Sequence, residues 1–148
     1  MSSTYVPTIS SGTAGPLGVL HLPRLWQKVS LESQGKLAAG YPGIGGGYDS
    51  MVLSALGLDP DAVRAFIKAE KPTYTQFEKW VRSQSGVKLD ASTVKALNDS
   101  IIGYNHGDDV RAGIFSANGL TDSDTPARDA ISLNNIDDWS EFHAAVLK

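Results

Sequence analysis

The sequence predicts an all-α fold: a single compact domain of six or seven short helices, with a glycine-rich loop between the first two. Apolar residues recur three and four positions apart, which places them on one face of a helix. Capping and helix-ending residues bound these segments, whereas alternating strand patterns and runs of β-branched residues are missing. A chain of 148 residues is long enough to bury one core without disulfides or metal.

The N-terminal arm, residues 1–15, precedes a helical domain formed by residues 16–148. The arm is rich in Ser, Thr and Gly, a composition typical of a flexible tail. Tyr5, Val6 and Ile9 are the side chains that could hold it in place. They could pack on their own domain or on a neighbouring copy, and the second option predicts a homo-oligomer joined through the arm.

The first helix is predicted over about Leu22–Gln34, and Gly35 or Gly40 ends it. Pro23 suits its first turn, where the missing N–H costs nothing. Its apolar face follows the spacing i, i+3, i+4, i+7 and consists of Leu22, Leu25, Trp26 and Val29.

The glycine-rich loop, Gly40–Asp49, contains five glycines and a proline, with Tyr41, Ile44 and Tyr48 as its expected apolar anchors. We interpret the glycines as the place where the second helix crosses the first at a distance that only glycine allows. Consecutive glycines before a helix could instead form a nest of N–H groups for an anion. Asp49 is expected to cap the second helix.

Five further helices are predicted from their start signals. Asp59-Pro60 opens the third helix, and a capping box at Thr73–Gln76 opens the fourth. Asp90, Asp108 and Asn135 are expected to cap the fifth, sixth and seventh helices.

The three tryptophans each fall on the apolar side of a different predicted helix. We expect Trp26, Trp80 and Trp139 to be mostly buried, because indole rings dominate the apolar area that a core can bury. At least two of them should share one core.

The composition excludes several classes of function. The chain has no cysteine, which excludes disulfides, thiolate metal sites and a cysteine nucleophile. No apolar run approaches the roughly 20 residues of a membrane span, and the N-terminus lacks the regions of a signal peptide. We therefore expect a cytoplasmic protein with no membrane partner. No nucleic-acid partner is expected either, because no clustered basic face is evident.

Charge is divided unevenly along the chain. Residues 1–89 carry a net charge of +3 and residues 90–148 a net charge of −6, which together give the formal charge of −3. The favoured interpretation is that the two halves pack together and partly neutralise each other. The alternative is an acidic face that binds a basic partner.

A resemblance to a known family is carried by the segment Gly15–Lys28 and by three short motifs after it. Those motifs are Gly35-Lys36-Leu37, Tyr41 and Gly47-Tyr48-Asp49. The His-Leu-Pro-Arg block followed by Gly-Lys-Leu resembles an uncharacterised family of small bacterial soluble proteins, a domain-of-unknown-function family. The similarity covers most of Gly15–Trp80 and, more weakly, the remainder. It implies a bacterial, cytoplasmic, helical protein, and it implies no reaction, cofactor or catalytic residue.

One candidate ligand site combines the first helix with the glycine-rich loop. Arg24 and Lys28 share a helix face, and His21 lies one turn earlier, so together they could bind a carboxylate or phosphate. The candidate ligand-binding residues are His21, Arg24, Lys28, Gly45, Gly46, Gly47, Tyr48 and Asp49. In the alternative interpretation His21 caps a helix end, Arg24 pairs with a carboxylate such as Asp49, and these residues serve the fold alone.

Familiar catalytic and cofactor motifs are missing from this site. Gly43–Tyr48 matches only part of the G-x-G-x-x-G pattern, no strand precedes it, and the Walker lysine is absent. Elsewhere, His106-Gly107-Asp108-Asp109 is the one short cluster of metal-capable side chains, and helix capping accounts for its two acids. We therefore predict no metal and no cofactor. A Ser-His-Asp triad has no nucleophile-elbow motif to support it.

Two functional hypotheses follow. The leading one is a non-enzymatic helical interaction module or small-ligand-binding module, because capping and packing account for nearly every polar residue. Its partner would be an unknown protein or small molecule. The alternative is a small metal-independent enzyme, or an anion- or phosphate-binding protein, that uses the pocket at the first helix and the glycine-rich loop. Whether the protein is an enzyme stays open at the level of the sequence.

Overall fold

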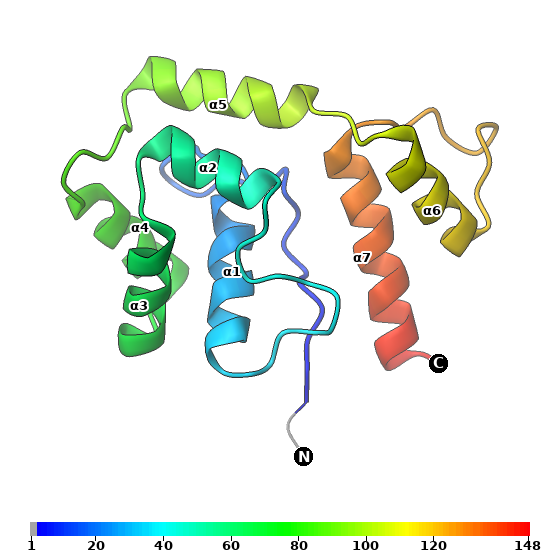
Figure 1. Ribbon diagram of the computed structural model, residues 1–148, viewed down its shortest axis with the longest axis horizontal. Helices are drawn as coiled ribbons and strands as arrows, with labels where there is room; N and C mark the ends of the chain where they lie inside the picture. The colour runs from blue at the N-terminus through cyan, green and yellow to red at the C-terminus, as the bar shows by residue number, and fades with distance from the viewer. Residues whose placement is uncertain (1–2) are drawn as a thin grey trace.

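Seven helices joined by turns and loops make up the computed structural model, which describes residues 3–148 (Figure 1). The helices are α1 (Leu22–Ser33), α2 (Tyr48–Leu56), α3 (Pro60–Glu70), α4 (Tyr74–Ser83), α5 (Ala91–Gly103), α6 (Asp108–Asn118) and α7 (Ala130–Val146). Within the described residues there are isolated β-bridges but no β-strand. The prediction of a single all-α domain is confirmed.

The main core forms around α1, which packs against α2, α3 and α4, while α5 lies along α2. Its largest fully buried side chains include Leu22, Leu25, Leu53, Leu56, Ile67, Phe77 and Ile101. A second, smaller cluster joins α6 to α7 through Ile114, Phe115 and Leu133. Ala130, at the start of α7, belongs to the main core, so α7 connects the two clusters.

Three of the predicted helix starts are confirmed in their capping contacts. The capping box of α4 is complete, because Thr73 and Gln76 each bond the other's main-chain N–H. Asp59 accepts a hydrogen bond from the first turn of α3, and Asp90 does the same for α5. These contacts satisfy N–H groups that have no partner inside the helix.

The caps predicted for the second and sixth helices are wrong. Gly47 is the N-cap of α2 and Gly107 is the N-cap of α6, so Asp49 and Asp108 lie inside the first turn instead. A carboxylate in the first turn is still stabilised by the positive end of the helix dipole. In these two helices the acidic residue at the start therefore reflects attraction to the helix dipole and not a capping hydrogen bond. The side chain of Asp49 is left available for other contacts.

The last helix begins earlier than predicted. Asp129 caps α7 by accepting a hydrogen bond from the Ser132 N–H, whereas Asn135 lies inside the helix. This earlier start places Ala130 and Leu133 where they can be buried. Burial of these two side chains accounts for the earlier start.

The tryptophan prediction holds for two of the three residues. Trp26 and Trp80 are partly buried against the main core, and the Trp80 ring stacks on Phe66 with 4.6 Å between centroids. Trp139 is 66% exposed, so its predicted burial is wrong. Six helix positions separate it from buried Leu133, which turns it about 240° around α7 and away from that face.

The described part of the N-terminal arm lies on its own domain. Tyr5 exchanges two main-chain hydrogen bonds with the segment that follows α1. The side-chain oxygen of Gln27 accepts hydrogen bonds from the N–H groups of Thr8 and Ile9, each at 3.0 Å, and Val6 is buried. Residues 3–15 are thus held on their own domain in spite of a composition typical of a flexible tail, and the remaining two arm residues lie outside the described chain. A homo-oligomer joined through the arm stays a prediction.

The glycine-rich loop does not follow the interpretation of a close helix crossing. A Cβ at Gly46 or Gly47 would meet no atom within 4 Å, so no helix approaches either residue closely. Gly40 requires glycine because its φ is +89°, and a Cβ at Gly43 would overlap the carboxylate of Glu32 on α1. The loop therefore runs beside α1 and leaves open space next to its last glycines.

Candidate functional site

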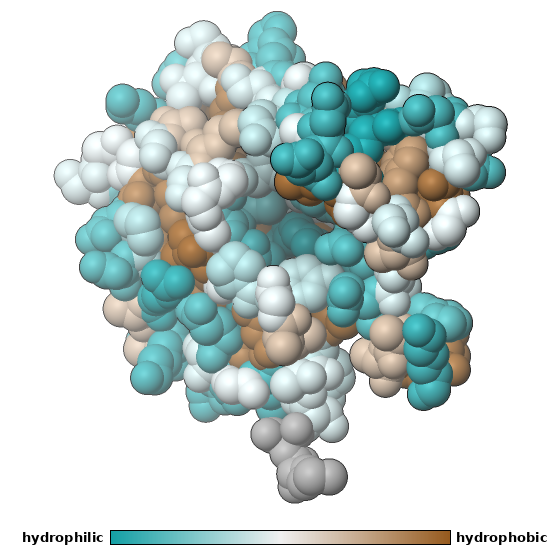
Figure 2. All heavy atoms as spheres, turned by 45° about the vertical axis from the view of Figure 1, so that its right-hand side comes forward, coloured by the Kyte–Doolittle hydropathy of each residue, from teal (hydrophilic) through white to brown (hydrophobic). Residues whose placement is uncertain are grey.

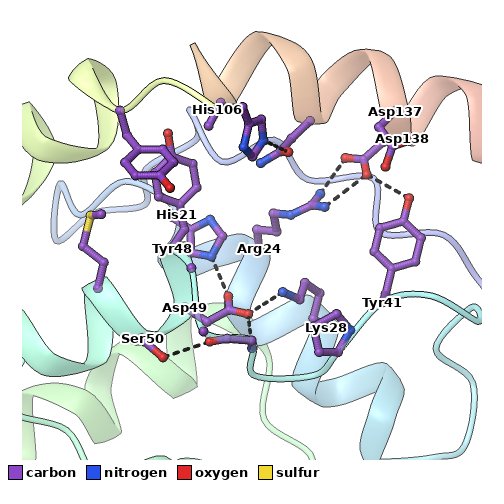
Figure 3. A pocket seen from close by; sticks show the side chains of 18 of the residues that line it. His21, Arg24, Lys28, Tyr41, Tyr48, Asp49, Ser50, His106, Asp137 and Asp138 are labelled. Carbon is purple, nitrogen blue, oxygen red and sulfur yellow. Dashed lines mark hydrogen bonds and ion pairs between the residues drawn. The ribbon is translucent and has the colours of Figure 1, made fainter. Parts of the chain in front are cut away.

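A pocket of about 610 Å³ lies where the glycine-rich loop, α1, α2 and α7 meet. A hollow with hydrophilic residues is visible in the middle of the face shown in Figure 2. All eight predicted ligand-binding residues line the pocket: His21, Arg24, Lys28, Gly45, Gly46, Gly47, Tyr48 and Asp49. The structure thus brings together every member of the predicted site. Figure 3 shows the side chains of His21 and Lys28 directed toward Asp49, and that of Arg24 directed toward Asp138.

Asp49 is the centre of the polar wall formed by α1 and α2. One of its oxygens lies 2.6 Å from Nε2 of His21, and the other lies 2.5 Å from Nζ of Lys28 and accepts the Gly45 N–H at 2.7 Å (Figure 3). Asp49, His21 and Lys28 are all buried. The buried carboxylate is therefore fully paired by its own chain.

The Asp49 contacts explain the direction of its pKa. Burial acts to raise the pKa of this carboxyl, but the hydrogen bond from His21, the charge of Lys28 and the Gly45 N–H outweigh burial and hold the pKa below its ordinary value of 3.8. Asp49 is thus a carboxylate at neutral pH. It cannot accept a proton as a general base without losing these bonds.

His21 is held as a neutral imidazole. Burial lowers its pKa below the ordinary value of 6.5, the nearby charges of Lys28 and Arg24 lower it further, and the bond to Asp49 only partly opposes them. A neutral ring carries one N–H, which donates from Nε2 to the Asp49 carboxylate, and Nδ1 accepts the hydroxyl of Ser11 at 2.9 Å. The ring therefore has no free nitrogen for a ligand.

His21 does not act as the predicted helix cap. It occupies the N-cap position of α1, but its side chain makes no capping bond, and its φ is +70°. The left-handed region costs a non-glycine residue about 1–2 kcal/mol. The bonds to Ser11 and Asp49 hold the residue in this conformation.

Ser11, His21 and Asp49 have the composition of a catalytic triad without its accessibility. In a triad the serine oxygen faces the substrate and the histidine takes its proton. Ser11 is 1% exposed and does not line the pocket, because it lies behind the imidazole ring. The three residues therefore form a structural hydrogen-bond chain that orients the pocket wall.

Arg24 pairs with a carboxylate, as the alternative interpretation expected, but the carboxylate is Asp138 of α7 and not the Asp49 named as an example. Its guanidinium contacts both carboxylate oxygens of Asp138, at 2.7 and 3.1 Å, and also donates to the main-chain oxygen of Ile9 at 2.9 Å. The Tyr41 hydroxyl donates to Asp138 at 3.0 Å. This fork-shaped pair connects α1, the glycine-rich loop and α7 across the pocket.

An aromatic wall, which we define as Tyr48, Tyr104 and His106, closes another side of the pocket. The rings of Tyr48 and Tyr104 meet edge to face at 5.7 Å between centroids, and those of Tyr104 and His106 at 6.2 Å. The Tyr48 hydroxyl donates to the main-chain oxygen of Ile101 at 2.6 Å, and burial raises the pKa of that hydroxyl to about 12. His106 shares a 2.8 Å hydrogen bond with Asn134 of α7.

The pocket also contains residues that the sequence reasoning missed. They are mainly from α7 and the segment before α6: Tyr104, His106, Asn134, Asp137 and Asp138, together with Tyr41 of the loop. The uneven charge of the two halves was the one available signal, because Arg24 and Asp138 belong to opposite halves. Their pairing agrees with the interpretation that the halves neutralise each other.

The one short cluster of metal-capable side chains in the sequence, His106–Asp109, does not converge on a common point. His106 turns toward Asn134, while Asp108 and Asp109 stay in the first turn of α6. Among residues 3–148, no three side chains of His, Asp or Glu come together as a metal would require.

Within residues 3–148, every helix is too short or too polar to cross a bilayer. Comparison of the chain with protein-family models, curated proteins and solved structures finds no match.

Proposed function

We propose that this protein is a small-ligand-binding module and that the pocket between α1, the glycine-rich loop and α7 holds the ligand. The observation that carries this proposal is the placement of two buried ion pairs, Arg24–Asp138 and Lys28–Asp49, in the wall of an open cavity. Buried ion pairs add little net stability, because desolvation offsets most of their attraction. Their position in a cavity wall is therefore better explained by a role in holding that wall in a fixed shape for a ligand.

The dimensions and construction of the pocket support the proposal. Its volume of about 610 Å³ falls in the range of small-molecule sites, which are largely pre-formed and combine apolar walls with a few fixed polar groups. In its α1 wall, His21 and Arg24 are each held by at least two bonds, and Lys28 is held by its bond to Asp49. The strained backbone of His21 also lies in this wall, as strain often does at binding sites.

A fragment screen tests the proposal. We expect ligand-observed NMR to find small polar fragments that bind the wild-type protein but not Ser54→Trp, in which a large ring is added to an exposed α2 residue that lines the pocket. Ser116→Trp, an exposed helical serine on α6 outside the pocket, is the matched control and should bind as wild type does. A screen with no binders, or binding that Ser54→Trp leaves intact, contradicts the proposal.

The catalytic and anion-binding alternatives remain hypotheses without a contact that favours them. Both cations of the predicted anion site are already paired with carboxylates. The N–H of Gly45, a member of the proposed nest, already donates to Asp49. The bacterial origin, the cytoplasmic location and the family resemblance rest on sequence patterns and are part of the proposal.

A further inference from the structure

We propose that the ligand is a small organic cation, with an ammonium group beside Asp137 and an apolar body against the aromatic wall of Tyr48, Tyr104 and His106. This inference rests on the proposed function of the pocket. Two observations carry it: the charges of the side chains that line the cavity, and the pairing of all but one of those charges.

The charge of the pocket lining is negative. Arg24 and Lys28 are its two cationic side chains, and Asp49, Asp137 and Asp138 are its three carboxylates. Lys28 is paired with Asp49, and Arg24 is paired with Asp138. When the histidines are counted as neutral, the pocket lining has a net charge of −1. A single positive charge on the ligand would balance it.

Asp137 is the carboxylate that remains for a ligand. Among the described residues it has no hydrogen-bond or ion-pair partner, and it lies at the pocket beside Asp138 on α7 (Figure 3). Half-burial raises its pKa, as do the charges of Glu141 and Asp138, while the charge of Arg24 partly opposes them. The ionised group is thus in an unfavourable potential that a bound cation would relieve.

The aromatic wall supplies the second half of the recognition. Ring faces attract ammonium groups, and aromatic sides of a pocket bury the apolar part of a ligand. Tyr48 is buried and fixed by its hydroxyl bond to α5, so it is a rigid surface, while Tyr104 is 46% exposed and can cover a ligand. Met51 of α2 adds a polarisable apolar side chain to the same cavity.

An anionic ligand fits these contacts less well. It would have to displace Asp49 from Lys28, or Asp138 from Arg24, and each displacement would leave a buried carboxylate without its partner. It would also approach a lining that is already negative. The site that the sequence suggested for an anion is thus occupied by the carboxylate of Asp49.

Three probes of one shape test the inference on the intact protein. These are 2-phenylethylamine, 2-phenylethanol and phenylacetate, titrated at pH 7 and followed by protein NMR. We expect the amine to bind at least about tenfold more tightly than the other two, which corresponds to about 1.4 kcal/mol. Asp137→Asn should weaken binding of the amine by about tenfold and leave the alcohol unchanged, whereas Asp137→Glu should retain the preference.

The control is Glu70→Gln, which removes an exposed carboxylate at the end of α3, outside the pocket, and should leave all three affinities unchanged. The comparison of probes on wild-type protein does not depend on any variant folding. The inference is overturned if the alcohol or the acid binds as tightly as the amine, if none of the three binds, or if Asp137→Asn leaves amine binding intact. Fragments of other charge that still bind in the pocket would then leave the proposed function standing, whereas an empty fragment screen would remove both.

Discussion

Asp49 is the residue on which the polar wall of the pocket depends. It pairs with Lys28, accepts from the Gly45 N–H and orients His21, which in turn is bonded to Ser11. Removing one member of a buried pair is costly, because the partner keeps its desolvation penalty and loses its attraction. The stability of the wall can therefore be tested at this one carboxylate.

We expect Asp49→Ala to lower the free energy of unfolding by about 3–5 kcal/mol, because Lys28 would remain as a buried charge with no partner. Urea unfolding at pH 7 measures the change. Asp99→Ala is the matched control, because its ion pair with Lys95 is exposed and its loss should have little effect. Equal effects of the two substitutions would show that the Asp49 network is not a stabilising unit.

The protonation of His21 gives the second test at this scale. Its folded pKa lies below 6.5, so the unfolded chain binds the proton first as the pH falls. The contribution of neutral His21 to the free energy of unfolding is therefore complete above pH 6.5 and is lost as the pH falls below that value. The loss has a limiting slope of about 1.4 kcal/mol per pH unit down to the folded pKa. The folded pKa of Asp49 lies below 3.8, so protonation of this carboxylate lowers the stability only below about pH 3.8. It does not contribute between that pH and 6.5.

We expect urea unfolding of wild-type protein between pH 7 and 4.5 to show this loss. His21→Gln, which keeps an N–H donor but does not titrate, should flatten the profile. His143→Gln, which replaces an exposed histidine, should retain the loss of stability seen in the wild-type protein. A wild-type profile that stays level, or one that His21→Gln leaves unchanged, would contradict the assignment of a neutral buried imidazole.

At the level of elements, the helices could be predicted because their signals are local. The capping box of α4 and the acid caps of α3 and α5 involve residues two or three positions apart, and that spacing is visible in the sequence. The orientation of a helix is different, because it depends on which neighbours are present. Trp139, like Trp80, lies at helical spacing from other apolar residues of its helix. However, α7 packs against α6 through the face that holds Leu133.

Substitution of the two tryptophans tests this contrast. Trp80→Ala should lower the free energy of unfolding by about 3 kcal/mol, because the ring packs between Phe66 and Phe77 against the main core. Trp139→Ala should change it by less than about 0.5 kcal/mol, because the ring is 66% exposed. Thermal or urea unfolding of both variants measures the difference. A large loss from Trp139→Ala would mean that another surface covers that side of α7.

For the molecule as a whole, the pocket is made by contacts that span most of the sequence. Arg24 reaches Asp138 across 114 positions, and His106 reaches Asn134 across 28. The α1 and loop half of the site could be predicted, because helical spacing and a glycine run are both local patterns. The α7 half could not, because no local pattern identifies which carboxylate pairs with Arg24, and the nearer Asp49 was an equally good electrostatic choice.

Chemical-shift mapping of the fragment screen on the wild-type protein tests most directly whether this pocket binds ligands. We expect bound fragments to shift the backbone amides of Gly45–Asp49 and of Asp137 and Asp138 together, because these two segments line the same cavity. Shifts confined to α3 and α4, or to the exposed end of α7, would contradict the assignment of the binding site.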